Sequence, residues 1–394
     1  MPLGTYVKIE SAAKSRIWKD RKRVMGLLDM ELTERCNNSC IHCCINLAAD
    51  DSYSEKRELS KDEIKGILNE AVSLGFITVR FTGGEPLLRE DFEEIYIFTR
   101  QLGLKVMIAT NATLITPQLA DLFSRIPPLK NIGVSVYGMK KHSYEAVTRC
   151  AGSFEKAWRG IDLLLEKNIP FTVRSAFLEP NKDEREEFEK WAATIPWMNG
   201  LPLYSSFFTL HLRRDTNKSN MIRKLRMTPQ EGIEFIMSGK SLHKRAGDIF
   251  CSQCVGPRGN KLFNCSAGRN CGSVDAYGNF QLCIMLKHPD TVYDLKNGSL
   301  KDAMDNFFPK IRKMRITNPD YLSRCGRCFL KDFCSQCPAK SWAEHGSLDK
   351  PVEYICEITH EKARSYGLLD KHECAWDVEN WKERVEAYLK KKEA

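Results

Sequence analysis

The chain has 394 residues, of which 42% are hydrophobic and 28% are charged, and its formal net charge is +9. This length suffices for one large and one smaller domain, and the composition is that of an ordinary soluble globular protein. No apolar run is long enough to cross a bilayer and no apolar segment of a signal peptide is found at the N-terminus, which excludes a membrane or secreted protein and predicts a cytoplasmic one.

Strand-like and helix-like segments alternate along the first two hundred residues. Ser60 and Glu63 form a capping box that begins a helix with one apolar face, Gly75 ends it, and Thr116 with Pro117 begins a later helix. We expect strands at 27–33, 76–82, 104–110, 131–136 and 171–175, and helices at 60–75, 89–102, 154–167 and 183–194. This alternation indicates βα units and a parallel sheet. About six units fit before residue 240, so the expected fold is α/β, a partial open (β/α)6 barrel.

After residue 240 the alternation of strands and helices gives way to short segments rich in Gly, Asn and Cys. A domain held together by metal is typically built this way. We therefore divide the chain into an N-terminal extension (1–24), the barrel (25–240), a cysteine-rich domain (241–365) and a helical tail (366–394).

Sixteen cysteines are far too many for a cytosolic protein of this length if all are inert. The reducing cytosol argues against a disulfide framework, which leaves metal or redox chemistry. Cys36, Cys40 and Cys43 follow directly on the first strand. Three thiolates at this spacing can bind three irons of a cubane cluster and leave the fourth iron open to a small molecule. A zinc site completed by Cys44 or His42 is the alternative.

Two further features accompany this cysteine triad. His42 stands just before the third cysteine of the CxxxCxxC pattern, and Gly83-Gly84-Glu85-Pro86 ends the next strand. In this combination the chain resembles the radical S-adenosylmethionine superfamily. The resemblance implies a [4Fe-4S] cluster at the triad, whose open iron is chelated by the amino and carboxylate groups of S-adenosylmethionine.

The same resemblance implies roles for residues around this cofactor. His42 would pack near the adenine. Gly83, Gly84 and Glu85 would hold the methionine amino group, because glycines let the backbone approach a ligand and a carboxylate attracts an ammonium.

Later strand ends carry weaker matches to the superfamily. Asn111 and Ser135 would lie near the ribose, with capping of strand ends as the alternative. Arg174 would contact the cofactor carboxylate, with a surface or buried ion pair as the alternative. The catalytic acid or base stays unknown, and Tyr137, Arg174 and the Cys251/Cys254 pair are candidates only.

A second group of cysteines follows the pattern Cys265-x5-Cys271-x6-Gly278-x4-Cys283, then Cys325-x2-Cys328-x5-Cys334-x2-Cys337, then Cys356. This resembles the SPASM domain of peptide maturases and anaerobic sulfatase-maturating enzymes. The resemblance implies two closed auxiliary [4Fe-4S] clusters, which would transfer electrons: one held by Cys265, Cys271, Cys283 and Cys337, the other by Cys325, Cys328, Cys334 and Cys356. The partition of Cys334 and Cys337 is open, because the last gap is a residue shorter than in many relatives. Two zinc sites are the alternative.

The other cysteines stand outside these patterns. Cys251 and Cys254 form a redox pair, an extra metal site or a buried pair. Cys44, Cys150 and Cys374 are most simply small apolar core residues.

The resemblance implies an enzyme that cleaves S-adenosylmethionine reductively to a 5′-deoxyadenosyl radical and abstracts hydrogen from a substrate carbon. The segment 135–154, with SVYG, HSYEAVT and GSF, resembles maturases of ribosomally made peptides, so we expect a peptide cross-link or other oxidation first. Ile284 and Met285 follow Cys283 where sulfatase-maturating relatives carry an acidic base, which argues against formylglycine formation. Oxidation or decarboxylation of a tetrapyrrole side chain is second. A non-catalytic electron carrier or nucleic-acid-binding protein is the alternative of another class.

The expected partners follow from this predicted function. They are a peptide or small-molecule substrate and an electron donor such as flavodoxin or ferredoxin. The roughly thirty residues before the first strand leave no room for a winged leader-binding domain. A separate protein, or the basic stretch near 213–226, would bind a leader peptide; a solvated face is the other reading of that stretch. Nucleic acid is not expected, because the basic residues lack interleaved aromatics.

Overall fold

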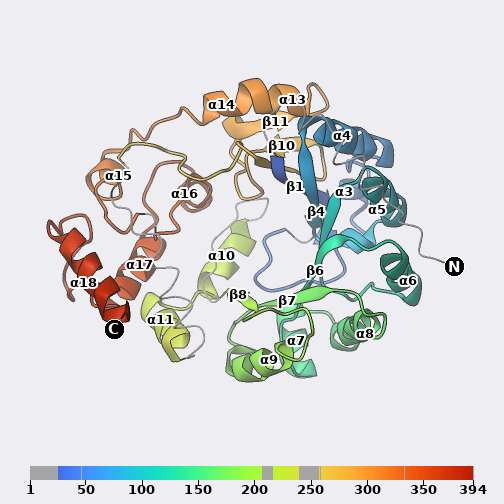
Figure 1. The fold of residues 1–394 in the computed structure, drawn as a ribbon, viewed down its shortest axis with the longest axis horizontal. Coiled ribbons are helices and arrows are strands. Elements are labelled where there is room, and N and C mark those ends of the chain that lie inside the picture. The colour runs from blue at the N-terminus through green and yellow to red at the C-terminus, as the bar shows by residue number, and fades with distance from the viewer. Residues whose placement is uncertain are drawn as a thin grey trace. The chain divides into compact units, whose positions relative to one another are not determined.

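The computed structural model describes residues 25–45, 47–205, 216–238, 257, 259–331 and 333–393, and Figure 1 labels its elements. The chain divides into two compact units. The first contains the residues up to Ser205 and Ser266–Ile311, and the second contains Ser206–Cys265 and Arg312–Ala394. Among the described residues, none of the helices is both long and apolar enough to cross a bilayer.

The first unit is built on one sheet with the strand order β11-β10-β9-β1-β4-β5-β6-β7-β8. Its strands are β1 (Met25–Thr33), β4 (Phe76–Gly83), β5 (Lys105–Thr110), β6 (Leu129–Ser135), β7 (Phe171–Ala176), β8 (Leu203–Ser205), β9 (Cys271–Val274), β10 (Asn279–Gln281) and β11 (Val292–Asp294). Neighbours from β9 to β8 pair in parallel, and β10 and β11 add antiparallel pairs. Among the described strands none joins β8 to β11, so the predicted partial open barrel is confirmed.

Helices connect the parallel strands as predicted. The helices of this unit are α3 (Ser52–Glu55), α4 (Lys61–Leu74), α5 (Phe92–Gln101), α6 (Pro117–Arg125), α7 (Lys141–Thr148), α8 (Ser153–Glu166), α9 (Arg185–Ala192), α13 (Leu300–Asp302) and α14 (Phe308–Ile311). Figure 1 shows α4, α5, α6 and α8 along one side of the strands. The capping box of Ser60 and Glu63 is present at α4, and Gly75 ends this helix in the left-handed conformation.

The two faces of β1 differ in chemistry because strand side chains alternate. Leu28, Met30 and Leu32 are buried on one face, and Asp29 and Glu31 are buried on the other. The two carboxylates are paired: Arg80 Nε lies 2.7 Å from Asp29 Oδ1, and Lys287 Nζ lies 2.9 Å from Glu31 Oε2. The second face is therefore a polar lining with compensated charges.

Strands β9, β10 and β11 come from the segment that was expected to belong to the cysteine-rich domain. Leu27 to Met30 of β1 pair with Cys271 to Val274 of β9, so this segment extends the barrel sheet and packs with the first unit. The domain boundaries expected near residues 240 and 365 stay predictions.

The second unit is helical in its described part. Its helices are α10 (Thr216–Lys224), α11 (Pro229–Ser238), α15 (Pro319–Ser323), α16 (Pro338–His345), α17 (Glu353–Ser365) and α18 (Trp381–Glu393). One apolar cluster of this unit contains Phe329 and Leu330 with Ala363 of α17 and Val385 of α18.

Candidate active site

The end of β4 crosses close to the segment that leads to the cysteine triad. The Gly84 N–H donates to the Thr33 carbonyl (2.8 Å) and the Glu85 N–H donates to the Arg35 carbonyl (2.9 Å). A Cβ on Gly83 would lie 2.0 Å from the Thr33 oxygen, and one on Gly84 would lie 2.1 Å from the Arg35 oxygen. Gly83 also has a φ of +127°, which favours glycine. The two glycines thus allow backbone to pack against backbone at this crossing.

The triad lies in a loop that begins with β2 (Arg35–Cys36), which pairs with β3 (Leu47–Ala48). This loop is fastened to the C-terminal end of α7. The N–H groups of Ser39 and Ile41 donate to the carbonyls of Thr148 and Val147, both at 2.9 Å. These two backbone hydrogen bonds hold the loop at Ser39 and Ile41, which lie between the first and third cysteines.

The Cys36 thiol of this loop suits a positively charged partner. Burial, together with the negative charges of Glu85 and Cys43, raises the pKa of Cys36 to about 12. The Asn38 N–H at 3.4 Å is a donor to the Cys36 sulfur, but it does not offset burial. A thiolate here therefore needs a cation, which the irons of a cluster supply. The residues present fit the cluster that the sequence implies at Cys36, Cys40 and Cys43.

Glu85 is fully buried and its carboxylate is occupied by protein donors. Oε1 accepts from the Thr110 hydroxyl (2.8 Å) and the Leu87 N–H (3.1 Å), and Oε2 accepts from the Asn111 N–H (2.8 Å). Burial still raises the pKa of Glu85 to about 7. The side chain joins the start of the short 3₁₀ helix Pro86–Leu88 to the end of β5. Its expected contact with the methionine amino group stays a prediction.

Asn111 is connected to the cysteine loop through its side chain. Its Nδ2 donates to Asn37 Oδ1 (2.9 Å) and lies 3.9 Å from the Cys36 sulfur. Its Oδ1 accepts from the Thr113 N–H (2.9 Å), and Asn37 Nδ2 donates to the Thr113 hydroxyl (2.7 Å). Sequence reasoning missed Asn37 and Thr113. The only signal for Asn37 was its position directly after Cys36.

An aromatic and polar group gathers at the ends of β6 and β7. The rings of His42 and Tyr137 meet edge to face with centroids 4.8 Å apart, and burial lowers the pKa of His42 to about 4, which keeps it neutral. Burial and the nearby Cys40 raise the pKa of Tyr137, which is hydrogen-bonded to Ser135. Ser135 pairs with Arg174 across the sheet. Burial lowers the pKa of Arg174, whose charge acts on both Tyr137 and Glu85. The structure thus brings His42, Ser135 and Arg174 together.

A buried ion pair holds the residue that precedes the first cysteine. Arg35 donates through Nε and Nη2 to both oxygens of Glu58, at 3.0 and 3.2 Å. Arg89 lies 3.5 Å from the same carboxylate and donates to the carbonyls of Leu32 (3.2 Å) and Leu59 (3.0 Å). These residues were not singled out from the sequence, where nothing distinguishes them from other charged residues.

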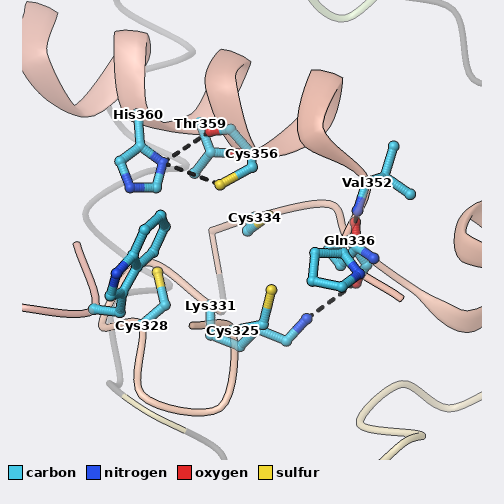
Figure 2. A pocket seen from close by; sticks show the side chains of 11 residues that line it. Cys325, Cys328, Lys331, Cys334, Gln336, Val352, Cys356, Thr359 and His360 are labelled. Carbon is cyan, nitrogen blue, oxygen red and sulfur yellow. Dashed lines mark hydrogen bonds between the residues drawn. The ribbon is translucent and has the colours of Figure 1, made fainter. Parts of the chain in front are cut away.

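Four cysteines of the second unit surround one pocket (Figure 2). They are Cys325, Cys328, Cys334 and Cys356. Burial raises the pKa of each of Cys325, Cys328 and Cys356, to about 11 for Cys325 and about 12 for Cys356. Cys337 is absent from the pocket lining that the structure describes and caps the start of α16. This arrangement fits a four-thiolate cluster and favours the partition in which Cys334 belongs to it.

The four cysteines that were predicted to hold the other auxiliary cluster belong to different units. Cys271 and Cys283 lie in the first unit, and Cys265 and Cys337 lie in the second. Their common cluster stays a prediction. Cys251 and Cys254 fall outside the described residues, and Cys44, Cys150 and Cys374 are half-buried.

Comparison with known proteins gives a family match over the barrel. Residues 30–192 match the model of the Radical SAM superfamily. The chain is 26% identical over 361 residues to the AdoMet-dependent heme synthase of Methanosarcina barkeri, a match that covers 83% of this chain and 95% of that protein. It is 31% identical over 163 residues to the Fe-coproporphyrin III synthase of the same organism, covering 41% of this chain and 39% of that protein.

Two solved structures share the fold over most of the chain. SuiB of Streptococcus suis, bound to the precursor peptide SuiA, has a TM-score of 0.60 at 15% identity and covers 86% of this chain and 78% of its own. The anSMEcpe structure with bound AdoMet has a TM-score of 0.56 at 15% identity, covering 86% of this chain and 97% of its own. At this identity the likeness is one of fold.

Proposed function

We propose that this chain, whose residues 30–192 match the model of the Radical SAM superfamily, is an enzyme that splits S-adenosylmethionine at Cys36, Cys40 and Cys43 and uses the product to oxidise a substrate at carbon. When bound, the cluster and S-adenosylmethionine supply a one-electron cleavage that yields methionine and a 5′-deoxyadenosyl radical. The observation that carries this proposal is the cysteine loop, whose backbone is held by α7 and in which burial raises the pKa of the Cys36 thiol.

The chain's own residues position the cofactor and exclude water. The three thiolates would hold the cluster at which S-adenosylmethionine binds. The edge-to-face pair of His42 and Tyr137 forms an apolar wall against water. Arg174 would contact the cofactor carboxylate and Ser135 would lie near the ribose, and Asn111 holds the cysteine loop through Asn37. Glu85, which joins Leu87 to the end of β5, would meet the methionine amino group.

A peptide is the first candidate substrate. The fold match to SuiB, which was solved with a precursor peptide, covers most of this chain, and the 135–154 segment resembles peptide maturases. A leader-binding partner and a flavodoxin-like or ferredoxin-like electron donor belong to this proposal.

A tetrapyrrole is the second candidate, and one observation favours it. The similarity to the AdoMet-dependent heme synthase covers 83% of this chain and 95% of that protein. Release of 5′-deoxyadenosine distinguishes the two candidates, because the true substrate accelerates it. Iron coproporphyrin III and the product of a short reading frame beside the gene are the two probes.

The experiment that tests the shared chemistry uses anaerobically reconstituted protein. We expect about twelve irons per chain if all three clusters assemble, and 5′-deoxyadenosine when reduced protein meets S-adenosylmethionine. Cys40→Ala should abolish this release, whereas Cys150→Ala, a half-buried thiol outside the predicted sites, should retain it. Reduced, iron-loaded protein that never fragments S-adenosylmethionine would contradict the proposal. Two bound zinc ions without iron would point to structural metal sites.

A further inference from the structure

Positively charged side chains surround the four-cysteine pocket of the second unit. Arg324 Nη2 donates to the Cys356 sulfur over 3.9 Å. The same guanidinium makes two bonds to Glu353, at 2.8 and 2.7 Å, and stacks over the Trp376 ring at 4.8 Å. The carboxylate and the indole fix its orientation, so the bond to sulfur comes from a rigid donor.

Lys331 brings a second positive charge into the same pocket. It lines the pocket together with Cys325 and Cys334 (Figure 2). Its Nζ donates to the Gln336 carbonyl (3.3 Å) and lies 5.2 Å from the centre of the Tyr321 ring. The Lys331 side chain thus lies in the wall of the pocket that the cysteines line, where its positive charge is close to a group bound at their sulfurs.

His360 adds a neutral donor on the opposite wall. The Ala375 N–H donates to His360 Nε2 (3.1 Å). Because Nε2 accepts this bond, the ring proton of the neutral imidazole is on Nδ1. Nδ1 lies 2.8 Å from the Cys356 carbonyl and 3.5 Å from the Cys356 sulfur. His360 and Arg324 thus approach one sulfur together.

We propose that Arg324, Lys331 and His360 raise the reduction potential of the cluster held by Cys325, Cys328, Cys334 and Cys356, so that this site accepts electrons. The inference rests on the proposed function, which places a cluster there. Reduction adds one negative charge to a cluster, and nearby cations with hydrogen bonds to its sulfurs stabilise the reduced form. In the overall oxidation, a substrate radical loses one electron and one proton, and the oxidised cluster gains that electron.

The test compares two half-buried lysines of the same unit. Lys331→Met removes the charge that faces the thiols. Lys362→Met is the matched control, because the Lys362 ammonium lies 4.3 Å from the Phe333 ring centre and burial lowers its pKa to about 8 with no thiol among the causes. Both changes are made in Cys40→Ala protein that also carries Cys271→Ala, which removes the signals of the first cluster and of the other auxiliary cluster. Midpoint potentials are measured by redox titration followed by electron paramagnetic resonance.

We expect Lys331→Met to lower the equilibrium constant for one-electron reduction of this cluster at least tenfold, which is ~59 mV toward negative potential. Arg324→Gln should shift it in the same direction, Lys331→Arg should keep the parent value, and Lys362→Met should leave it unchanged. If Lys331→Met and Arg324→Gln both have the same midpoint potential as the parent protein, the inference is wrong. Should Lys331→Met fail to bind iron, Arg324→Gln alone decides.

Metal content separates this inference from the proposed function. Zinc, or no metal, at these four cysteines in the parent that carries Cys40→Ala and Cys271→Ala overturns the cluster itself. Iron with an unshifted potential in the charge variants overturns only the electrostatic role of Arg324 and Lys331.

Discussion

Replacing Gly84 by alanine should damage the first cluster site through the backbone. The new Cβ would lie 2.1 Å from the Arg35 carbonyl oxygen, 2.6 Å from its carbon and 2.7 Å from the Glu34 oxygen. All three neighbours are backbone atoms, so no rotamer change relieves the overlap. Since real Cβ contacts do not fall below 3.0 Å, the Arg35 carbonyl must retreat by roughly 0.9 Å.

This displacement sets the expected size of the effect. The Arg35 carbonyl accepts the Glu85 N–H at 2.9 Å, and a retreat of that size breaks the bond. Overpacking costs about 1–3 kcal/mol and a buried donor left unpaired costs about 1–3 kcal/mol. We expect a loss of about 3 kcal/mol in the free energy of unfolding. For a domain of 150–250 residues this is roughly 6–12 °C in Tm.

Two measurements check the prediction. Thermal unfolding of the metal-free protein reports the backbone conflict, and iron content reports displacement of Cys36, which follows Arg35 in β2. Iron should fall by about four per chain. Gly66→Ala is the matched control, because Gly66 lies within α4 and a Cβ there meets nothing within 4 Å. It should stabilise the protein by about 1 kcal/mol. Parent-like Tm and iron content in Gly84→Ala would refute the reasoning.

Three further changes test other parts of the structure. Burial lowers the pKa of Lys362 from 10.5 to about 8. Between pH 8 and pH 10.5 the unfolded chain therefore binds more protons than the folded chain, so the free energy of unfolding of the parent protein rises with pH. Lys362→Met should remove this rise and stabilise the protein at pH 7 by up to about 3 kcal/mol; equal slopes in urea unfolding at several pH values would contradict it. Glu58→Gln should lower the free energy of unfolding by about 3 kcal/mol, because it breaks a buried ion pair with Arg35. It should also reduce 5′-deoxyadenosine release. An unchanged Tm would contradict this prediction. Ser60→Ala should cost about 1 kcal/mol through loss of the cap at α4 and leave iron content unchanged, as thermal unfolding and iron assay would show.

Local patterns were enough to predict most of the barrel. The five predicted strands correspond to β1, β4, β5, β6 and β7, and Ser60 and Thr116 cap the helices that they were expected to begin. These features depend on residues a few positions apart, which a sequence displays directly. Helix α7 was missed, although its carbonyls fasten the cysteine loop. It has only eight residues and no side-chain hydrogen bond at its N-cap, and its segment was interpreted as a motif.

Contacts between distant residues could not be predicted in the same way. Arg35 and Glu58 are 23 positions apart, and Asn37 and Thr113 are 76 apart. Lys331 lies between Cys328 and Cys334 in the sequence, but no local pattern shows that its side chain lines the pocket of these cysteines. Such roles depend on which chain segments fold over a side chain, and one sequence does not contain that information.

The two cysteine sites differ in the charge that surrounds them. At Cys36, the neighbouring donors are the neutral Asn38 and Asn111, and the buried Glu85 opposes negative charge on the sulfur. At Cys356, Arg324 donates directly to the sulfur. Since reduction adds negative charge, the first environment disfavours it and the second favours it. A site that must transfer an electron into a sulfonium needs a low potential, and a site that must take an electron from a substrate needs a higher one. The difference in local charge therefore matches the two tasks that the proposed chemistry requires.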